Sequence, residues 1–304
     1  MGLVSTTTVG RLDHGAPLHF SFGGAECNAA ITASRLGSRV AWASRLGDDS
    51  VGHAIRRALA AEGITVVAQT VPDRPTGLMV KERRSPLRQR VSYYRSGSAA
   101  STFRHTDLDD ELLAQTGVVL VSGVTAALTP HLPDELESLF SRAHDAGALV
   151  ALDLNFRSAL WTREDARRTY DRLAPAADLL FSGVDEASIV SEAAVDLSTA
   201  LIALGRYDRA IIVATDGARG AAARTPDGDH YVDAVAVPVI DTVGAGDAFV
   251  GGFLAEWQSH ADVSESLRTA AAAGAHACMF AGDWEGAPTR DDLAQLSQGF
   301  IVER

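Results

Sequence analysis

The stretch DTVGAGDAF at residues 241–249 joins two segments of different character. Residues 235–240 are apolar and extended in character, whereas residues 248–258 are helix-forming, so Gly244, Ala245 and Gly246 are predicted to lie where a helix begins. The first N–H groups of a helix have no partner within it, and the helix dipole adds positive charge there. Because small side chains let an anion approach these donors, we predict phosphate binding at Gly244, Ala245 and Gly246.

Asp247 follows these three residues directly. A carboxylate beside bound phosphate is a poor electrostatic partner, but it is well placed to accept the proton of a hydroxyl that attacks phosphorus. Asp247 is therefore a candidate general base. A glycine-rich turn with an acidic cap explains the same residues without any function, and loose glycine patterns are common.

The composition limits the class of the protein and its partners. At 304 residues and 32.0 kDa, we expect one large domain, 1–304, with an appendage. The net charge of -12 argues against nucleic acid or a membrane surface as a partner. No apolar run approaches the roughly 20 residues that span a bilayer, and the first residues lack a signal-peptide pattern, so a cytoplasmic protein is expected. Cys27 and Cys278 have no metal-binding spacing and are predicted to be buried apolar groups.

Short apolar runs alternate with helical periods along most of the chain. Such runs are typical of buried parallel strands, and they lie at residues 40–44, 118–122, 149–154, 179–182 and 210–214. This repeated order predicts a three-layer α/β/α doubly wound sheet, which binds ligands at the C-terminal ends of its strands. Residues 66–100 depart from it, and we interpret them as a small β-sheet that projects from the body. Residues 221–237 are predicted to form an antiparallel hairpin that turns at residues 225–228.

The pattern DTxGAGD closely resembles the C-terminal signature of the ribokinase, or PfkB, family of sugar and nucleoside kinases, and GGAECNAA at residues 23–30 is similar to its N-terminal signature. The resemblance implies a ribokinase-like fold with ATP and Mg²⁺ as cofactors. It also implies that the projecting sheet is a lid over the sugar and a dimer surface, which would make the protein a homo-oligomer. Gly24 and Asn28 would contact the substrate. An ordinary turn and helix cap at Asn28 is the alternative.

Further residues match the nucleotide and metal sites of the family. TDGARG at residues 215–220 resembles its nucleotide loop, so Thr215, Gly217 and Gly220 are expected along ATP, although such a motif alone indicates only a turn. Glu186 matches a residue that holds Mg²⁺ through water. Gly183 replaces the asparagine that usually lies three residues before it, which removes one expected phosphate or solvent contact.

Within the family, the chain most resembles kinases of 2-keto-3-deoxygluconate, a sugar acid. The resemblance lies in residues 93–99, 122–128, 153–161 and 282–288. It implies that Arg95 and Arg157 clamp the substrate carboxylate, that Tyr93 and Asp283 contact the sugar, and that Asn155 lies towards the ATP phosphates. For a single arginine, a surface ion pair is the ordinary alternative.

The chain also departs from these kinases. Met79 occupies a position where they commonly have a tyrosine that contacts substrate. The strand and Gly-Glu turn that precede the segment equivalent to residues 1–4 are absent, and we expect the start codon to lie further upstream. Two rival functions follow: a kinase of neutral sugars or nucleosides, which has no use for Arg95 and Arg157, and a catalytically silent protein that binds a sugar acid.

Overall fold

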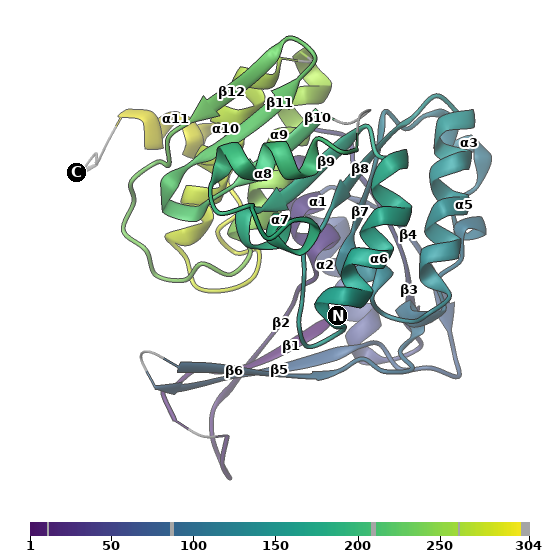
Figure 1. Cartoon of the computed structure of the whole chain (residues 1–304). Coiled ribbons are helices and arrows are strands. Elements are labelled where there is room, and N and C mark those ends of the chain that lie inside the picture. Colours follow the sequence, from purple (N-terminus) through teal and green to yellow (C-terminus); the bar gives the residue numbers. More distant parts are fainter. Residues whose placement is uncertain (11, 86–87, 208–210, 261, 299–304) are drawn as a thin grey trace.

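The computed structural model describes residues 1–304 except 11, 86–87, 208–210, 261 and 299–304. Its largest sheet has the strand order β12-β11-β10-β9-β8-β7 (Figure 1). Four strands are parallel: β7 (Val118–Ser122), β8 (Leu149–Asp153), β9 (Leu179–Gly183) and β10 (Ile211–Thr215). The antiparallel strands β11 (Ala221–Thr225) and β12 (Gly228–Val232) complete it. The predicted runs at 118–122, 149–154, 179–182 and 210–214 thus form this sheet, except that residue 210 lies outside the described residues, whereas the run at 40–44 belongs to a separate pair of strands. The hairpin is shorter than expected.

Helices cover both faces of this sheet, as the three-layer prediction requires. Successive residues of a strand point to opposite faces, and Val150 and Leu152 pack on one side whereas Ala151 packs on the other. The first side carries α3 (Asp110–Ala114), α4 (Gly123–Ala126), α5 (Leu132–Asp145), α6 (Arg163–Leu173), α7 (Val184–Val190) and α8 (Leu197–Leu204). The second side carries α9 (Ala245–His260) and α10 (Val263–Cys278), and α1 (Ala25–Arg35) packs against α9.

A smaller pair of parallel strands lies beside this body. β3 (Ala41–Gly47) and β4 (Thr65–Val71) are joined by α2 (Ser50–Ala61), whose Ile55 and Leu59 are fully buried with Ile31 of α1. In the part of the chain described, no strand pairs with both β3 and β7. The further strand expected from the resemblance stays a prediction.

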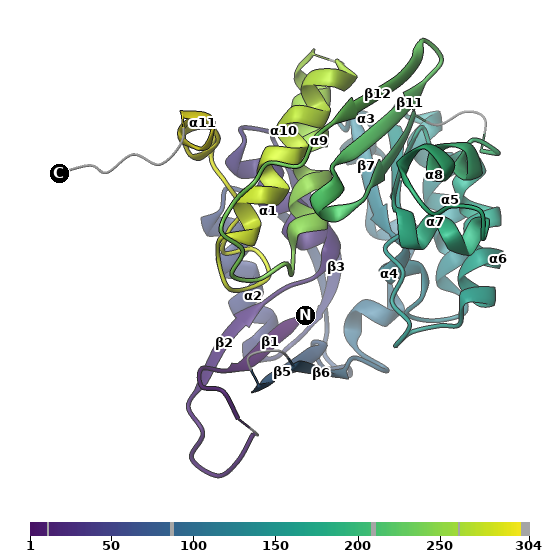
Figure 2. The ribbon, with the colours of Figure 1, turned by 60° about the vertical axis from the view of Figure 1, so that its left-hand side comes forward.

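The projecting sheet contains four strands in the order β2-β1-β5-β6, and Figures 1 and 2 show it extending away from the helices. These are β1 (Gly2–Thr6), β2 (Leu18–Phe22), β5 (Leu78–Ser85) and β6 (Arg88–Tyr94). The expected boundaries, 66–100, need correction, because β4 pairs with β3 in the body and Ala99–Thr102 forms a 3-10 turn. The chain's first residues belong to this sheet, since β1 pairs in parallel with β5.

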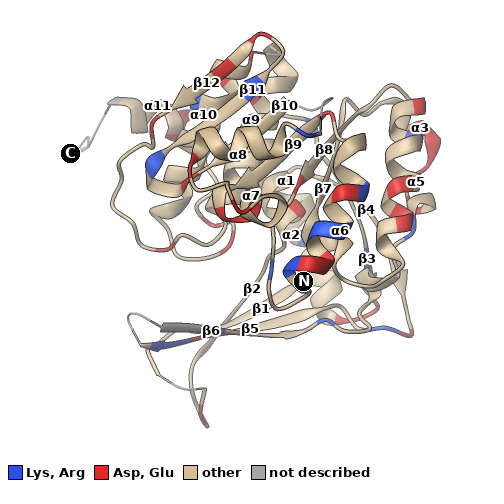
Figure 3. Ribbon diagram, in the orientation of Figure 1, with Lys and Arg blue, Asp and Glu red and all other residues tan. Residues whose placement is uncertain are grey.

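The last third of the chain carries the DTVGAGDAF segment, residues 241–249. No strand is assigned to residues 235–240, but α9 begins at Ala245, so the predicted helix start is confirmed. α11 (Arg290–Gln298) ends the described chain. Acidic and basic residues are interspersed along α6 (Figure 3). None of the helices within the described residues is long and apolar enough to cross a bilayer.

Candidate active site

The turn into α9 can contain only glycine at its first predicted anion-binding position. Gly244 has a φ of +77°, and a Cβ atom added there would lie 1.9 Å from the carbonyl oxygen of Asp283. A side chain would therefore both strain the backbone and collide with it. Ala245 and Gly246 form the first turn of α9. The three residues thus occupy a helix N-terminus, where backbone N–H groups suit an anion.

Asp247 lies in the same turn and is 9% exposed. The side-chain amide of Asn28 donates a hydrogen bond to its Oδ2 at 2.7 Å, and that of Asn155 approaches Oδ1 at 3.4 Å. Burial raises the pKa of Asp247 to about 7, and the charges of Asp283 and Glu26 add to this increase. The hydrogen bond from Asn28 and the charge of Arg157 lower the pKa but do not cancel the effect of burial. A carboxylate with a pKa near neutrality is suited to general base catalysis.

Asn28 lies inside α1, four residues after the N-cap residue Gly24, so the helix-cap alternative for Asn28 is wrong. Gly24 has a φ of +152°, a conformation that favours glycine. The preceding Gly23 allows a second close approach, because a Cβ atom there would lie 2.4 Å from Asp283 Oδ2. Asn28, Asp247 and Asp283 are thereby gathered around the start of α9.

Buried polar atoms without partners mark the same region. In the described part of the chain, six buried side-chain nitrogen or oxygen atoms have no hydrogen-bond partner: Asn28 Oδ1, Arg95 Nε, Asn155 Oδ1, Asp283 Oδ1, His131 Nε2 and Trp161 Nε1. The first four belong to predicted site residues. Since buried polar groups are nearly always paired in folded proteins, these four indicate a place for a polar ligand.

Arg95 follows the last lid strand, β6, and is buried with its guanidinium 4.3 Å above the ring of Tyr93. Burial lowers the pKa of Arg95, and the charge of Arg157 lowers it further, whereas Tyr93 has the opposite effect and raises it. Arg157 is exposed, and among the described residues its side chain donates a hydrogen bond only to the carbonyl of Phe156, at 3.0 Å. Neither guanidinium has an ion pair within the described chain, which contrasts with the ordinary surface role of arginine.

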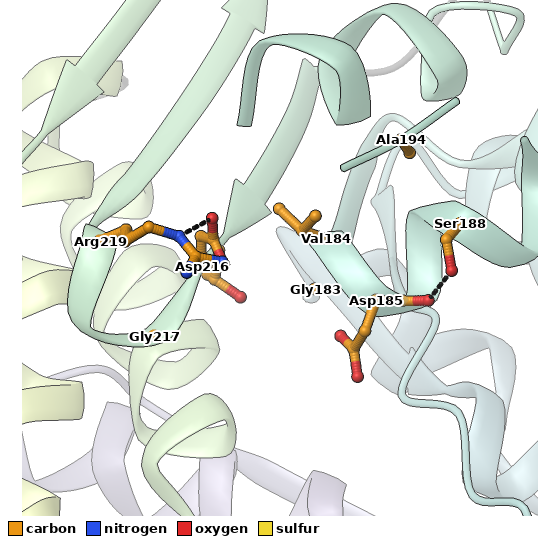
Figure 4. Close-up of a pocket in the computed structure, with 9 residues that line it drawn as sticks. Gly183, Val184, Asp185, Ser188, Ala194, Asp216, Gly217 and Arg219 are labelled. Atoms are coloured by element: carbon orange, nitrogen blue, oxygen red, sulfur yellow. Dashed lines mark hydrogen bonds and ion pairs between the residues drawn. The ribbon is translucent and has the colours of Figure 1, made fainter. Parts of the chain in front are cut away.

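The predicted nucleotide loop lines a cavity of about 330 Å³ with the start of α7 (Figure 4). Thr215, Gly217, Gly183 and Asp185 are among the residues that line it, and Figure 4 shows Gly217 on the side opposite Gly183 and Asp185. Gly220 closes the loop with a φ of +98°, and a Cβ atom there would lie 2.2 Å from the carbonyl oxygen of Val232. Asn155 does not line this cavity but lies at Asp247, at the end of β8.

Glu186 joins the ends of two neighbouring strands. Its Oε1 accepts the N–H of Phe156 at 2.8 Å, and its Oε2 accepts that of Gly183 at 2.9 Å. The absent asparagine side chain has a physical counterpart: a Cβ atom at Gly183 would lie 2.5 Å from Asp185 Oδ1, so the Asp185 carboxylate occupies that space. Within the described residues, no three His, Cys, Asp or Glu side chains are grouped closely enough to bind a metal ion directly.

Sequence reasoning missed a carboxylate at the centre of this arrangement. Asp153 ends β8 and accepts a 2.8 Å hydrogen bond from the Asn155 amide. Burial raises the pKa of Asp153 well above its usual range, and the charges of Glu186 and Asp247 raise it further. Its position at the C-terminal end of a parallel strand was the signal that could have identified it. The buried thiol prediction holds for Cys27, whose pKa burial raises to about 12, whereas Cys278 is only half-buried.

Comparison with known proteins assigns the family. Residues 4–290 match the model of the pfkB family carbohydrate kinases. The chain belongs to the PfkB family. A 2-dehydro-3-deoxygalactonokinase from Haloferax volcanii is 31% identical over 95% of this chain and 91% of its own length. A 2-dehydro-3-deoxygluconokinase from Bacillus subtilis is 30% identical over 90% of the chain and 85% of its own length.

The ribokinase-like fold is confirmed by solved structures. A PfkB protein from Polaromonas sp. JS666 superposes with a TM-score of 0.86 at 31% identity, over 97% of this chain and 96% of its own. Plant fructokinases also match the chain, at 28% to 30% identity. The protein is therefore a sugar kinase of the PfkB family, and kinases of this family use ATP.

Proposed function

We propose that this PfkB kinase transfers the γ-phosphoryl group of ATP to a terminal hydroxyl of a sugar acid, 2-keto-3-deoxygluconate or a close relative. The observation that carries the proposal is Arg95, a buried guanidinium whose Nε atom has no hydrogen-bond partner in the described chain, together with the positive charge of Arg157, which acts on it. A buried cation without a partner is costly, and a substrate carboxylate would supply one. Neutral sugars, the substrates of fructokinases, carry no carboxylate and would leave the buried guanidinium without an anionic partner.

The other side chains then take definite roles. Tyr93 presents its ring and hydroxyl to the sugar acid, and Asn28 and Asp283 bind its hydroxyl groups. Asp247 accepts the proton of the attacking hydroxyl. The N–H groups of Gly244, Ala245 and Gly246 stabilise the charge that develops on the phosphoryl group. The cavity lined by Thr215 and Gly217, in the loop that Gly220 ends, accepts the nucleotide.

The residues near Glu186 fit a hydrated magnesium ion. Asp153, Glu186 and Asp247 are oxygen donors, and oxygen donors suit Mg²⁺. Burial raises the pKa of Asp153, and the charges of Glu186 and Asp247 raise it further. Glu186 would hold the ion through water, since both its oxygens already accept backbone N–H groups. When bound, the ion would neutralise the phosphate charges. Asn155 orients Asp153 and approaches Asp247, with one amide nitrogen between the two carboxylates.

An ATP-consumption assay tests the proposal and separates it from both rivals. Purified protein with ATP and Mg²⁺ is given 2-keto-3-deoxygluconate, fructose or ribose in separate reactions. ATP consumption with 2-keto-3-deoxygluconate but not with fructose or ribose supports the proposal. Faster ATP consumption with a neutral sugar supports the rival kinase. Binding of the acid without ATP consumption supports the silent sugar-acid protein.

Activity should depend on the protonation of Asp247. The residue accepts a proton only when it is ionised, and its pKa is raised to about 7, so the active fraction decreases as the pH falls below that value. We expect kcat/KM for the acid to fall by about tenfold for each pH unit below about 6 and to level off above about 8. Initial rates across this range check this. A rate that stays flat down to about pH 5 would assign the proton transfer to another group.

The lid should close over the substrate. Tyr93 and Arg95 can reach a sugar acid only when the projecting sheet lies over the cleft, which also excludes water from phosphoryl transfer. We expect the acid and an ATP analogue together to slow amide hydrogen exchange in Leu78–Ser85 and residues 90–95 by at least about tenfold. Unchanged exchange on ligand addition would contradict the lid.

The exposed lid side chains Leu18, Phe20 and Tyr94 support a homo-oligomer that forms through this sheet.

A further inference from the structure

Lys81 is the only lysine among the 27 lysine and arginine residues of the chain. It lies on lid strand β5, yet its side chain is only 9% exposed because it reaches into the body. Its Nζ atom is 3.2 Å from Asp241 Oδ2 and 3.8 Å from Asp283 Oδ1. The proposed kinase mechanism gives this buried cation no role.

Both carboxylates that Lys81 contacts are attached to the turn into α9. Asp241 Oδ1 accepts the N–H of Val243 at 3.2 Å, and the Asp241 N–H donates to the carbonyl of Cys278 at 3.3 Å. The backbone carbonyl of Asp283 lies so close to Gly244 that no side chain fits at that position. One ammonium group therefore joins the lid to both sides of the predicted phosphate-binding turn.

We propose that Lys81 is a positioning residue, which fastens lid strand β5 to Asp241 and Asp283 and so holds Asp283 in place as an ionised acceptor for a substrate hydroxyl. This inference rests on the proposed function for the role of Asp283, but the contacts of Lys81 do not depend on it. Without the ammonium group, two partly buried carboxylates would face each other with no cation between them. Such an arrangement disfavours ionisation and close approach.

The charged groups around Asp283 come from several elements. Lys81 of β5 and the Met1 amino group next to β1 lower its pKa, whereas burial, the principal cause, raises it together with Glu285 and Asp241. After burial, the charge of Asp283 is among the causes that raise the pKa values of Asp247 on α9 and Cys27 on α1. An opposite charge at this distance typically shifts a carboxyl pKa by about one to three units. Removal of Lys81 should therefore protonate Asp283 at higher pH.

The first test uses Lys81→Met, which keeps the length of the side chain but not its charge, and Lys81→Arg, which keeps the charge. We expect Lys81→Met to raise KM for the sugar acid by at least about tenfold at pH 7. The pKa of Asp283, followed by carbon-13 nuclear magnetic resonance of its carboxyl group, should also rise. Lys81→Arg should retain the wild-type KM and the wild-type Asp283 pKa, and the exposed Arg83→Met on the same strand should change neither quantity.

The Asp283→Asn background decides whether these effects pass through Asp283. There, Lys81→Met should no longer raise KM for the sugar acid beyond the value of Asp283→Asn itself. A loss of kcat with an unchanged KM, or a rise in KM that persists in the Asp283→Asn background, overturns the proposal.

A second measurement separates this inference from the proposed function. Because the chain has a single lysine, isotope-labelled lysine gives one side-chain signal in a nuclear magnetic resonance spectrum. We expect that signal to shift in Asp241→Asn and in Asp283→Asn without any ligand, and to be unchanged in the control Glu62→Gln, whose ion pair with Arg35 lies elsewhere. If the lysine signal is unchanged in both Asp241→Asn and Asp283→Asn, Lys81 does not fasten the lid strand to these carboxylates. If it responds to them but no sugar acid is phosphorylated, only the proposed function is wrong.

Discussion

Asp247→Asn should lower kcat by about 10²–10⁴ while ATP still binds. Asparagine keeps the shape of the side chain, and its amide oxygen can still accept the hydrogen bond that Asn28 donates at 2.7 Å. What it loses is the ability to take a proton from the substrate hydroxyl. Rates with saturating ATP and sugar acid measure the loss, and calorimetry with an ATP analogue measures nucleotide binding.

Glu256→Gln is a matched control for this prediction. Glu256 is a second buried carboxylate on α9, also 9% exposed, but it pairs with Arg290 at the far end of the helix. Its loss should lower the melting temperature without a comparable change in kcat at a temperature where the protein is folded. The fall in kcat/KM below about pH 7 should disappear in Asp247→Asn but not in Glu256→Gln. Near-normal turnover in that variant would remove Asp247 from the mechanism.

The sequence predicted the parts of the fold that follow local rules. The apolar runs at residues 118–122 and 179–182 correspond to β7 and β9, because a buried parallel strand requires side chains that are apolar on both faces. The start of α9 was also predictable, since Gly244 and Gly246 interrupt an apolar run immediately before a helix-forming segment. The gathering of Asn28 with Asp247 came from the family resemblance and not from spacing, because 219 positions separate them.

Pairing between distant segments was beyond the reach of local patterns. The stretch 65–71 resembles a lid strand in composition, but its partner is β3, a choice made by the α2 crossover between them. Lys81 looks like a solvent-facing residue of an alternating strand, and only the tertiary fold brings Asp241 and Asp283 beneath it. Asp153 was hidden for a similar reason, since its environment depends on Glu186 and Asp247 from other elements.

Arg157→Met should reduce the preference for a sugar acid over a neutral sugar. The protein carries a net charge of -12, so an anionic substrate meets an unfavourable field unless positive charge is concentrated at the site. In the proposed function, Arg95 and Arg157 provide that charge, and neither has an ion pair with another residue in the described part of the chain. A charge-assisted hydrogen bond is worth about 1.5–3 kcal/mol, a factor of about 10 to 150 in affinity. We therefore expect 2-keto-3-deoxygluconate to exceed fructose or ribose by at least about a hundredfold in kcat/KM.

The variant should weaken the acid alone. Methionine retains much of the aliphatic length of arginine, so contacts with the carbon skeleton persist while the charge is lost, and kcat/KM for the acid should fall by about 10- to 150-fold. The rate with a neutral sugar should change by less than about threefold, since that substrate never used the charge. Arg163→Met is the matched control, because Arg163 is exposed nearby and donates to Ser188 Oγ rather than facing Arg95. Equal damage to the acid and the neutral sugar in Arg157→Met would make Arg157 structural, and the carboxylate clamp would then be wrong.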